Sequence, residues 1–122
     1  MNSCKHILVV EDEKELSDLM ADFLHMFGYT VSTAGDGYDA LALLETSTID
    51  IVITDVRMPR MDGMNLMTII KNKYSDIPVI IITGVNENKT RDIAHEKGAD
   101  AFIAKPFRMR DLKEVVDSMC KK

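Results

Sequence analysis

Residues 49–63 read IDIVITDVRMPRMDG, and this stretch decides the fold class. Its first part, residues 49–54, is a short apolar run rich in Ile and Val, which is typical of a strand buried on both faces of a sheet. The run ends in Asp55, and a loop carrying Pro59 follows at once. The stretch therefore predicts an interior strand of a parallel sheet, and it raises the question of why a carboxylate stands at the end of that strand.

Short apolar runs alternate with amphipathic segments along the rest of the chain. We expect strands over residues 6–10, 29–34, 49–54, 78–82 and 101–104. Between the strands, apolar residues recur at helical spacing, and Gly28 ends the first of these helical patterns. This alternation predicts an α/β fold, with a single doubly wound five-stranded parallel sheet and helices on both of its faces.

Residues 85–97, VNENKTRDIAHEK, form a segment with few apolar anchors. Ile93 and Ala94 are its main apolar side chains, so the segment can form a helix but buries little. Few anchors give a low free energy of local opening. If the protein has a movable element, we expect it in this segment.

Length and composition fit one ordinary domain. The chain has 122 residues, of which 46% are hydrophobic, and its formal net charge is −5. No apolar run approaches the roughly 18 residues that a membrane helix needs, and residues 1–7 lack a signal-like apolar region. We therefore expect a cytoplasmic protein with no membrane association. The acidic charge and the dispersed arginines argue against direct nucleic-acid binding, which uses clustered Lys and Arg.

The two cysteines, Cys4 and Cys120, do not form a metal-binding pattern. The sequence has no C-x-x-C pair and no Cys/His cluster, which argues against a zinc site. We expect two free thiols in a reducing compartment. Because both residues fall at the same end of the predicted fold, a regulatory disulfide is the alternative.

Polar residues follow four of the predicted strands: Glu11, Asp12, Asp55, Thr83 and Lys105. In a parallel sheet these strand ends share one edge, where ligands of such folds bind. Two carboxylates about 4 Å apart repel by about 4 kcal/mol at an effective dielectric of about 20. Either one of them holds a proton or a cation lies between them. Because the ligands are all oxygens, a hard divalent ion such as Mg²⁺ is the natural choice.

Each of these residues also has a purely structural interpretation. Glu11 or Asp12 could cap the first helix, Asp55 could begin a loop, and Lys105 could be a solvated surface lysine. Only their joint placement at the strand ends favours a chemical site. In such a site Lys105 and Thr83 would stabilise an anion on a carboxylate, and phosphoryl transfer to an aspartate needs mainly positioning and charge neutralisation.

Missing motifs disfavour other classes of phosphate chemistry. The fragment Asp55-Val56-Arg57 lacks the second aspartate of haloacid-dehalogenase-type phosphatases. No G-x-x-x-x-G-K-[ST] loop is present, which excludes a P-loop nucleotide enzyme. Gly35 and Gly37 alone do not make a dinucleotide-binding fingerprint.

Four segments together resemble the receiver domain of two-component response regulators, of the chemotaxis-regulator-like kind. They are ILVVEDE (7–13), DVRMPRMDG (55–63), PVIIITG (78–84) and FIAKPF (102–107). The resemblance covers essentially the whole chain. It implies a single receiver domain over residues 1–122 and the flavodoxin-like strand order 2-1-3-4-5.

The resemblance also implies a role for each residue of the site. Asp55 would be the phospho-acceptor, Lys105 would contact the phosphoryl oxygens, and Thr83 would move its hydroxyl onto the phosphoryl group. The ligands of Mg²⁺, or of Mn²⁺ in its place, would be Asp12, Asp55, the backbone carbonyl of Arg57 and, through a water, Glu11. The remaining implied positions are Phe102 as the switch aromatic, Pro106 after a cis peptide bond from Lys105, and Gly63 as a structural residue. Glu11 stands where many relatives have a second aspartate.

The implied function is a phosphorylation-dependent signalling switch. A histidine kinase or a histidine phosphotransfer protein would donate the phosphoryl group, and partner affinity would change through the surface formed by residues 83–107. Such a protein is not an enzyme beyond its own phosphorylation and slow autodephosphorylation, and it would be a monomer or a weak dimer. It would act on an unknown downstream protein or through an effector domain of a longer chain. An interaction module that takes no phosphate and a phosphatase with external substrates are the alternatives.

Overall fold

The computed structural model describes residues 4–84 and 88–120 of the chain. The strands are β1 (His6–Val10), β2 (Thr30–Ala34), β3 (Ile51–Asp55), β4 (Val79–Thr83) and β5 (Ala101–Ala104). They form one parallel sheet in the order β2-β1-β3-β4-β5. The predicted α/β fold and its strand order are thereby confirmed.

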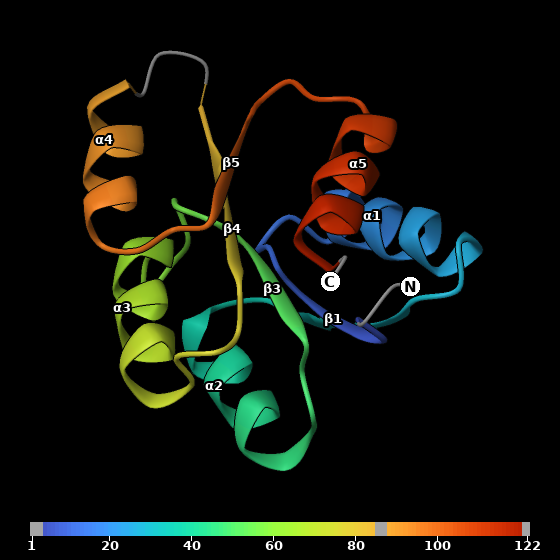
Figure 1. The fold of residues 1–122 in the computed structure, drawn as a ribbon, viewed down its shortest axis with the longest axis horizontal. Helices are drawn as coiled ribbons and strands as arrows, with labels where there is room; N and C mark the ends of the chain where they lie inside the picture. Colours follow the sequence, from blue (N-terminus) through green and yellow to red (C-terminus); the bar gives the residue numbers. More distant parts are fainter. Residues whose placement is uncertain (1–3, 85–87, 121–122) are drawn as a thin grey trace.

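Helices cover both faces of the sheet (Figure 1). They are α1 (Lys14–Met26), α2 (Gly37–Thr46), α3 (Gly63–Lys73), α4 (Asn88–Glu96) and α5 (Met109–Cys120). The first and last of them, α1 and α5, lie on one face, and α2, α3 and α4 lie on the other. Each strand therefore points its alternate side chains into two separate cores.

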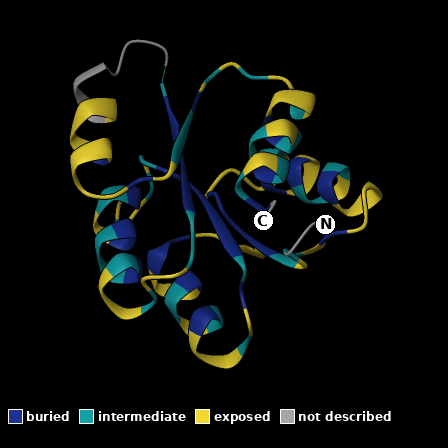
Figure 2. Ribbon diagram, viewed as in Figure 1, coloured by how far each residue is buried: buried dark blue, intermediate teal, exposed yellow. Residues whose placement is uncertain are grey.

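The central strands have no solvent-exposed face (Figure 2). All five residues of β3 and all five of β4 are buried. Ile51 and Ile53 pack in the core under α1 and α5, whereas Val52 packs in the core under α2, α3 and α4. This double burial explains why residues 49–63 begin with a continuous apolar run instead of an alternating one.

Three strands begin one or two residues later than the sequence suggested. Expected over 29–34, 49–54 and 78–82, they run over Thr30–Ala34, Ile51–Asp55 and Val79–Thr83. Before β3, the Asp50 carboxylate accepts hydrogen bonds from the backbone N–H groups of Lys5 and His6, both at 2.9 Å. β3 and β4 also end one residue later than expected, so Asp55 and Thr83 are the last residues of their strands.

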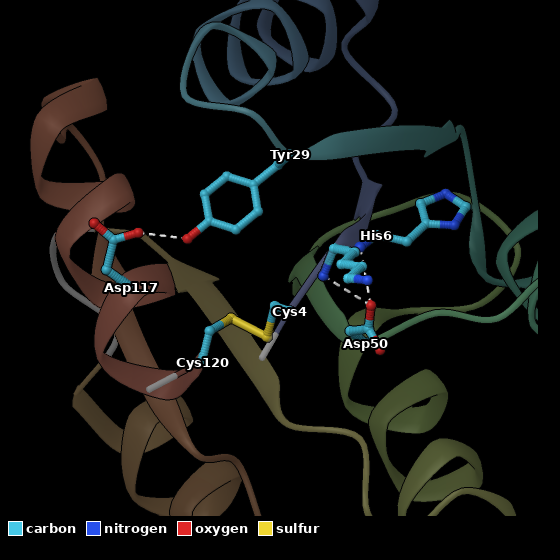
Figure 3. Close-up of a disulfide and its surroundings, with 7 residues drawn as sticks. Cys4, His6, Tyr29, Asp50, Asp117 and Cys120 are labelled. Carbon is cyan, nitrogen blue, oxygen red and sulfur yellow. Dashed lines mark hydrogen bonds between the residues drawn. A yellow bond between two sulfur atoms is a disulfide. The ribbon is translucent and has the colours of Figure 1, made fainter. Parts of the chain in front are cut away.

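Cys4 and Cys120 form a disulfide, with their Cα atoms 5.2 Å apart (Figure 3). The prediction of two free thiols is therefore wrong. The reason is topological: α5 ends next to the amino end of β1, so residues separated by 116 positions meet there. Next to the bond, the Tyr29 hydroxyl donates a hydrogen bond to the Asp117 carboxylate, which also ties α5 to the end of the sheet.

Only one of the two apolar residues of α4, Ile93 and Ala94, is buried. Ala94 is fully buried, but the Ile93 side chain is 47% exposed. Of the segment 85–97, residues 85–87 lie outside the described residues, as do the side chains of residues 88–90. The expectation that this segment moves stays a prediction. Across residues 4–84 and 88–120, no helix has the length and apolar character that a membrane crossing requires.

Candidate functional site

The strand ends bring Glu11, Asp55 and Lys105 together. The Lys105 Nζ atom lies 2.6 Å from Asp55 Oδ2 and 3.8 Å from Glu11 Oε1. Thr83 belongs to the same edge, because its carbonyl accepts a hydrogen bond of 2.7 Å from the Lys105 backbone N–H. The edge therefore combines two carboxylates, one ammonium group and one hydroxyl, contributed by the ends of β1, β3, β4 and β5.

Both carboxylates are nearly inaccessible to solvent. Glu11 is 3% exposed and Asp55 is 6% exposed. Burial, reinforced by the nearby Asp55 charge, raises the pKa of Glu11 to about 7, although the Glu13 backbone N–H and Lys105 both oppose this shift. Partial burial acts to lower the pKa of Lys105, but the hydrogen bond and the charge of Asp55 outweigh it and raise that pKa. The site thus holds negative charge that one ammonium group only partly compensates.

Asp12 lies apart from this cluster. Its side chain is exposed, and with Glu11 it lines a small hollow of about 190 Å³ that also includes Ser17 and Asp18. In the part of the chain that the structure describes, no group of three or more His, Cys, Asp or Glu side chains is close enough to hold a metal ion. The structure therefore joins two of the three expected carboxylates, and Asp12 as a metal ligand stays a prediction.

Two buried oxygens at this edge have no hydrogen-bond partner among the described residues: Glu11 Oε1 and Thr83 Oγ1. Such atoms are uncommon, because buried polar groups are nearly always hydrogen-bonded to protein or water. Mg²⁺ binds through only one or two carboxylates and keeps several of its waters, which could supply the missing donors. The chemistry of these residues therefore fits a hydrated hard cation.

The loop after β3 folds tightly back on Asp55. The Arg57 backbone N–H donates to Asp55 Oδ1 at 3.2 Å, and the Gly63 N–H donates to the Val56 carbonyl at 2.8 Å. A Cβ atom at Gly63 would collide with the Asp55 carbonyl group and lie 3.0 Å from Val56 Cα. The backbone around Asp55 therefore has its observed shape only if residue 63 lacks a side chain.

Comparison with known proteins identifies the fold family. A family model described as the response regulator receiver domain matches residues 7–117. The chain belongs to this family. The match runs from the second residue of β1 to all but the last three residues of α5. The features assembled above at the strand ends are therefore features of a receiver domain.

Curated relatives of this receiver domain are regulators about twice its length. The chain is 37% identical over 117 residues to the probable transcriptional regulator ycf27 of Cyanidium caldarium, covering 96% of this chain and 47% of the relative. It is 38% identical over 107 residues to response regulator SaeR of Staphylococcus epidermidis, covering 88% of this chain and 46% of the relative. The chain thus spans about half the length of the curated relatives it matches.

Among solved structures, the receiver domain is similar to response regulator TrrA of Thermotoga maritima in complex with Mg²⁺-BeF. The TM-score is 0.85 and the sequence identity 32%, over 94% of this chain and 98% of that one. The receiver domain of NtrX from Brucella abortus gives a TM-score of 0.89 at 34% identity, over 93% and 97% of the two chains. These similarities extend over nearly the full length of each receiver domain.

The pair Thr83 and Phe102 lies on neighbouring strands of the receiver domain. Thr83 is almost fully buried, and Phe102 is half-buried. The Arg91 guanidinium lies 5.5 Å from the centre of the Phe102 ring, and the His95 ring centre lies 6.2 Å from it. The Phe102 side chain therefore lies against α4. Its inward turn on activation stays a prediction. The Lys105–Pro106 peptide bond is cis.

Sequence reasoning missed two residues that shape this receiver domain next to Asp55. Arg60 has a positive φ of 69°, and its side chain forms an ion pair with Asp36. Asp36 also accepts a hydrogen bond of 2.9 Å from the Asp39 N–H and so caps α2. No pattern in the sequence indicated that Arg60 would contact Asp36, which lies 24 positions earlier in the chain.

Replacing Gly63 by alanine is expected to destabilise the protein by about 2 to 4 kcal/mol. The new methyl group would meet backbone atoms of Asp55 and Val56, which cannot move aside as a flexible side chain can. Urea unfolding of both proteins would measure the loss. Gly35→Ala is the matched control, because nothing lies within 4 Å of a Cβ atom there; equal stability of Gly63→Ala and wild type would contradict the prediction.

Proposed function

We propose that this receiver domain is a phosphorylation-dependent switch that takes a phosphoryl group onto Asp55 from a histidine kinase or a histidine phosphotransfer protein. The observation that carries the proposal is the contact of the buried Asp55 carboxylate with Lys105 Nζ at 2.6 Å, next to Glu11. An Asp55 carboxylate oxygen attacks phosphorus, the P–N bond of the donor phosphohistidine breaks, and the imidazole leaves with that electron pair. The product is an acyl phosphate on Asp55.

Lys105 and Thr83 act on the incoming phosphoryl group. Lys105 Nζ already lies at Asp55 Oδ2, so a short shift lets it contact an oxygen of the phosphoryl group. Thr83 Oγ1 is buried and has no partner among the described residues, so its hydroxyl is available to donate to another phosphoryl oxygen. Fixed donors that meet developing negative charge lower the barrier to phosphoryl transfer.

Mg²⁺, or Mn²⁺ in its place, would be held by Asp12, Asp55 and the Arg57 carbonyl, with Glu11 binding through a water. When bound, the ion supplies positive charge to the phosphoryl oxygens. Glu11 Oε1 has no hydrogen-bond partner among the described residues, and it supports this assignment because it lies buried at the same edge as Asp55. Asp55 would thus meet the donor with part of its charge already neutralised.

The signal leaves through the surface formed by residues 83–107. Thr83 would pass the change to Phe102 on the neighbouring strand, and the Phe102 ring lies 5.5 Å from the Arg91 guanidinium of α4. Among the α4 side chains that the structure describes, Ala94 is buried and Ile93 is exposed. A coupling free energy of about 1 to 3 kcal/mol is enough to change partner affinity several-fold or more. We propose a cytoplasmic protein, monomeric or weakly dimeric, that acts on a downstream protein or through an effector domain.

Acetyl phosphate with and without Mg²⁺ tests the proposed function. The protein is expected to gain the mass of one phosphoryl group, only when Mg²⁺ is present, and to lose it again slowly. No mass gain, together with unchanged amide NMR signals on adding beryllofluoride, would favour an interaction module that takes no phosphate. Sustained turnover of small phosphomonoesters would favour a phosphatase.

The affinity for Mg²⁺ is expected to fall by about tenfold between about pH 8 and about pH 6. Glu11 has its pKa raised from 4.5 to about 7, so the folded metal-free protein holds a proton there that the unfolded chain releases. The stabilising contribution of this proton is full below pH 4.5 and is lost as the pH rises from 4.5 to about 7. The same proton must leave before Mg²⁺ binds. Titration with Mg²⁺ at several pH values measures the effect, and Glu11→Gln is expected to remove the pH dependence. If the affinity for Mg²⁺ does not change between about pH 8 and about pH 6, the prediction is wrong.

Lys105→Ala is expected to slow labelling by acetyl phosphate about 10- to 100-fold, because it removes a donor to the phosphoryl oxygens. The fold is expected to persist, since the Lys105 side chain is 35% exposed and fills no core. Intact-mass kinetics measures the labelling rate and circular dichroism measures folding. Lys73→Ala is the control, because the Lys73 side chain is 59% exposed and forms an exposed ion pair with Glu45 of α2; equal labelling rates for the two variants would exclude the proposed role of Lys105.

A further inference from the structure

The loop of residues 56–62 joins Asp55 to α3 and contains Arg57. Its backbone is closed by two hydrogen bonds, from the Met61 N–H to the Pro59 carbonyl and from the Gly63 N–H to the Val56 carbonyl, both at 2.8 Å. Asp55 and Arg57 are two of the residues proposed above to hold Mg²⁺. The shape of this loop therefore decides where those oxygens lie.

Arg60 has an unfavourable backbone conformation within this loop. Its φ of 69° is the only positive value of a non-glycine residue in the described part of the chain. Residues with a Cβ atom seldom adopt this conformation, and they keep it only where surrounding contacts fix it. The strained position therefore directs attention to the contacts of the Arg60 side chain.

The Arg60 side chain contacts residues at the start of α2. Arg60 Nε donates to Asp36 Oδ2 at 2.8 Å, and Nη2 donates to the same oxygen. The guanidinium also lies 5.1 Å from the centre of the Tyr38 ring. Next to this pair, Met61 packs so closely on Gly37 that a Cβ there would lie 2.6 Å from the Met61 Sδ atom. Arg60 and Met61, neighbours in the loop, thus both contact the start of α2.

Asp36 is itself fixed. Its other oxygen, Oδ1, accepts the hydrogen bond from the Asp39 N–H that caps α2, and the residue is 8% exposed. The Asp39 N–H and the Arg60 guanidinium together hold the pKa of Asp36 below its usual value, so the carboxylate stays charged at neutral pH. Arg60 therefore binds an anchor that belongs to the rigid end of a helix.

We infer that Arg60 and Asp36 are positioning residues for the Mg²⁺ and phosphorylation site, because they clamp residues 56–62 against α2 and so hold the Arg57 carbonyl in place. This inference rests on the proposed function. Partners in the outer shell of a metal site typically contribute about 10- to 100-fold to metal affinity. Because the Arg60 side chain is 59% exposed, we expect an effect at the lower end, about tenfold in Mg²⁺ affinity.

Two substitutions separate the clamp from backbone strain and from helix capping. Arg60→Asn removes the guanidinium, and asparagine accepts a positive φ readily. Asp36→Asn removes the charge but keeps an oxygen that can cap α2. Each variant is titrated with Mg²⁺ alone, and hydrogen exchange is measured on the metal-free protein. The matched control is Lys73→Ala, which removes an exposed ion pair with Glu45 between α2 and α3, away from the loop.

Each single variant is expected to weaken Mg²⁺ binding by about tenfold, and the double variant by no more than either alone, because both remove the same interaction. The Met61 and Gly63 amides are expected to exchange faster in the metal-free variants, whereas the thermal stability of these variants is expected to stay near that of the wild type. Lys73→Ala is expected to match the wild type in Mg²⁺ affinity and in hydrogen exchange. Unchanged affinity and unchanged exchange in Arg60→Asn would overturn the inference and leave the proposed function standing. A wild-type protein that binds no Mg²⁺ would overturn the proposed function itself.

Discussion

Asp55→Asn is expected to abolish phosphoryl incorporation from acetyl phosphate and from any histidine donor. The amide of asparagine is nearly isosteric with the carboxylate but lacks the nucleophilic oxygen that forms the acyl phosphate. The fold is expected to survive, because the substitution also removes one of two buried negative charges and Lys105 can still pair with Glu11, 3.8 Å away. Intact-mass spectrometry after incubation with Mg²⁺ measures incorporation.

Asp62→Asn is the matched control for this experiment. Asp62 caps α3 by accepting a hydrogen bond of 2.9 Å from the Asn65 N–H, which an asparagine oxygen can also accept. Its side chain is exposed and lies outside the cluster at the strand ends. Labelling of Asp62→Asn at the wild-type rate would show that the loss is specific to Asp55. Labelling of Asp55→Asn at that rate would identify another residue as the acceptor.

Breaking the bond between Cys4 and Cys120 is expected to lower the free energy of unfolding by about 3 to 5 kcal/mol. A crosslink stabilises mainly by restricting the unfolded chain, and the effect grows with the length of the closed loop. Here the loop spans 116 positions, nearly the entire chain. Because total stabilities are typically about 5 to 15 kcal/mol, the loss would be a large share of the whole.

Urea unfolding with and without a dithiol reductant measures this difference. The variant Cys4→Ala/Cys120→Ala is the control, and alanine is chosen because Cys120 is fully buried and a polar replacement would add a separate cost. Reductant is expected to lower the stability of the wild type to near that of the double variant and to leave the variant unchanged. Two titratable thiols in protein purified without reductant, with no response to the dithiol, would contradict the prediction.

The predicted sheet follows from features that act locally in the sequence. The Val and Ile runs of β1, β3 and β4 identify strands buried on both faces, and Gly28, with a φ of 95°, ends the first helical pattern as expected. Because all strands are parallel, the residues after them had to meet at one edge. The contact between Asp55 and Lys105 could therefore be anticipated without knowledge of any distance.

Features that depend on three-dimensional placement were not predictable in this way. The exposure of Asp12 depends on how the chain turns into α1. The start of β3 depends on the Asp50 side chain binding backbone N–H groups of the first strand region. The left-handed conformation of Arg60 depends on a partner 24 positions earlier in the chain. Propensity and periodicity describe neighbours along the chain, so contacts of this kind lie beyond them.

The crosslink between Cys4 and Cys120 also closes residues 4–120 into a covalent ring. A protease that cuts once inside the ring, for example in an exposed surface turn, produces a nicked molecule whose pieces stay joined. Its mass would change only by the water added at the cleaved bond. The two fragments would separate on a denaturing gel only after the sulfur–sulfur bond is opened.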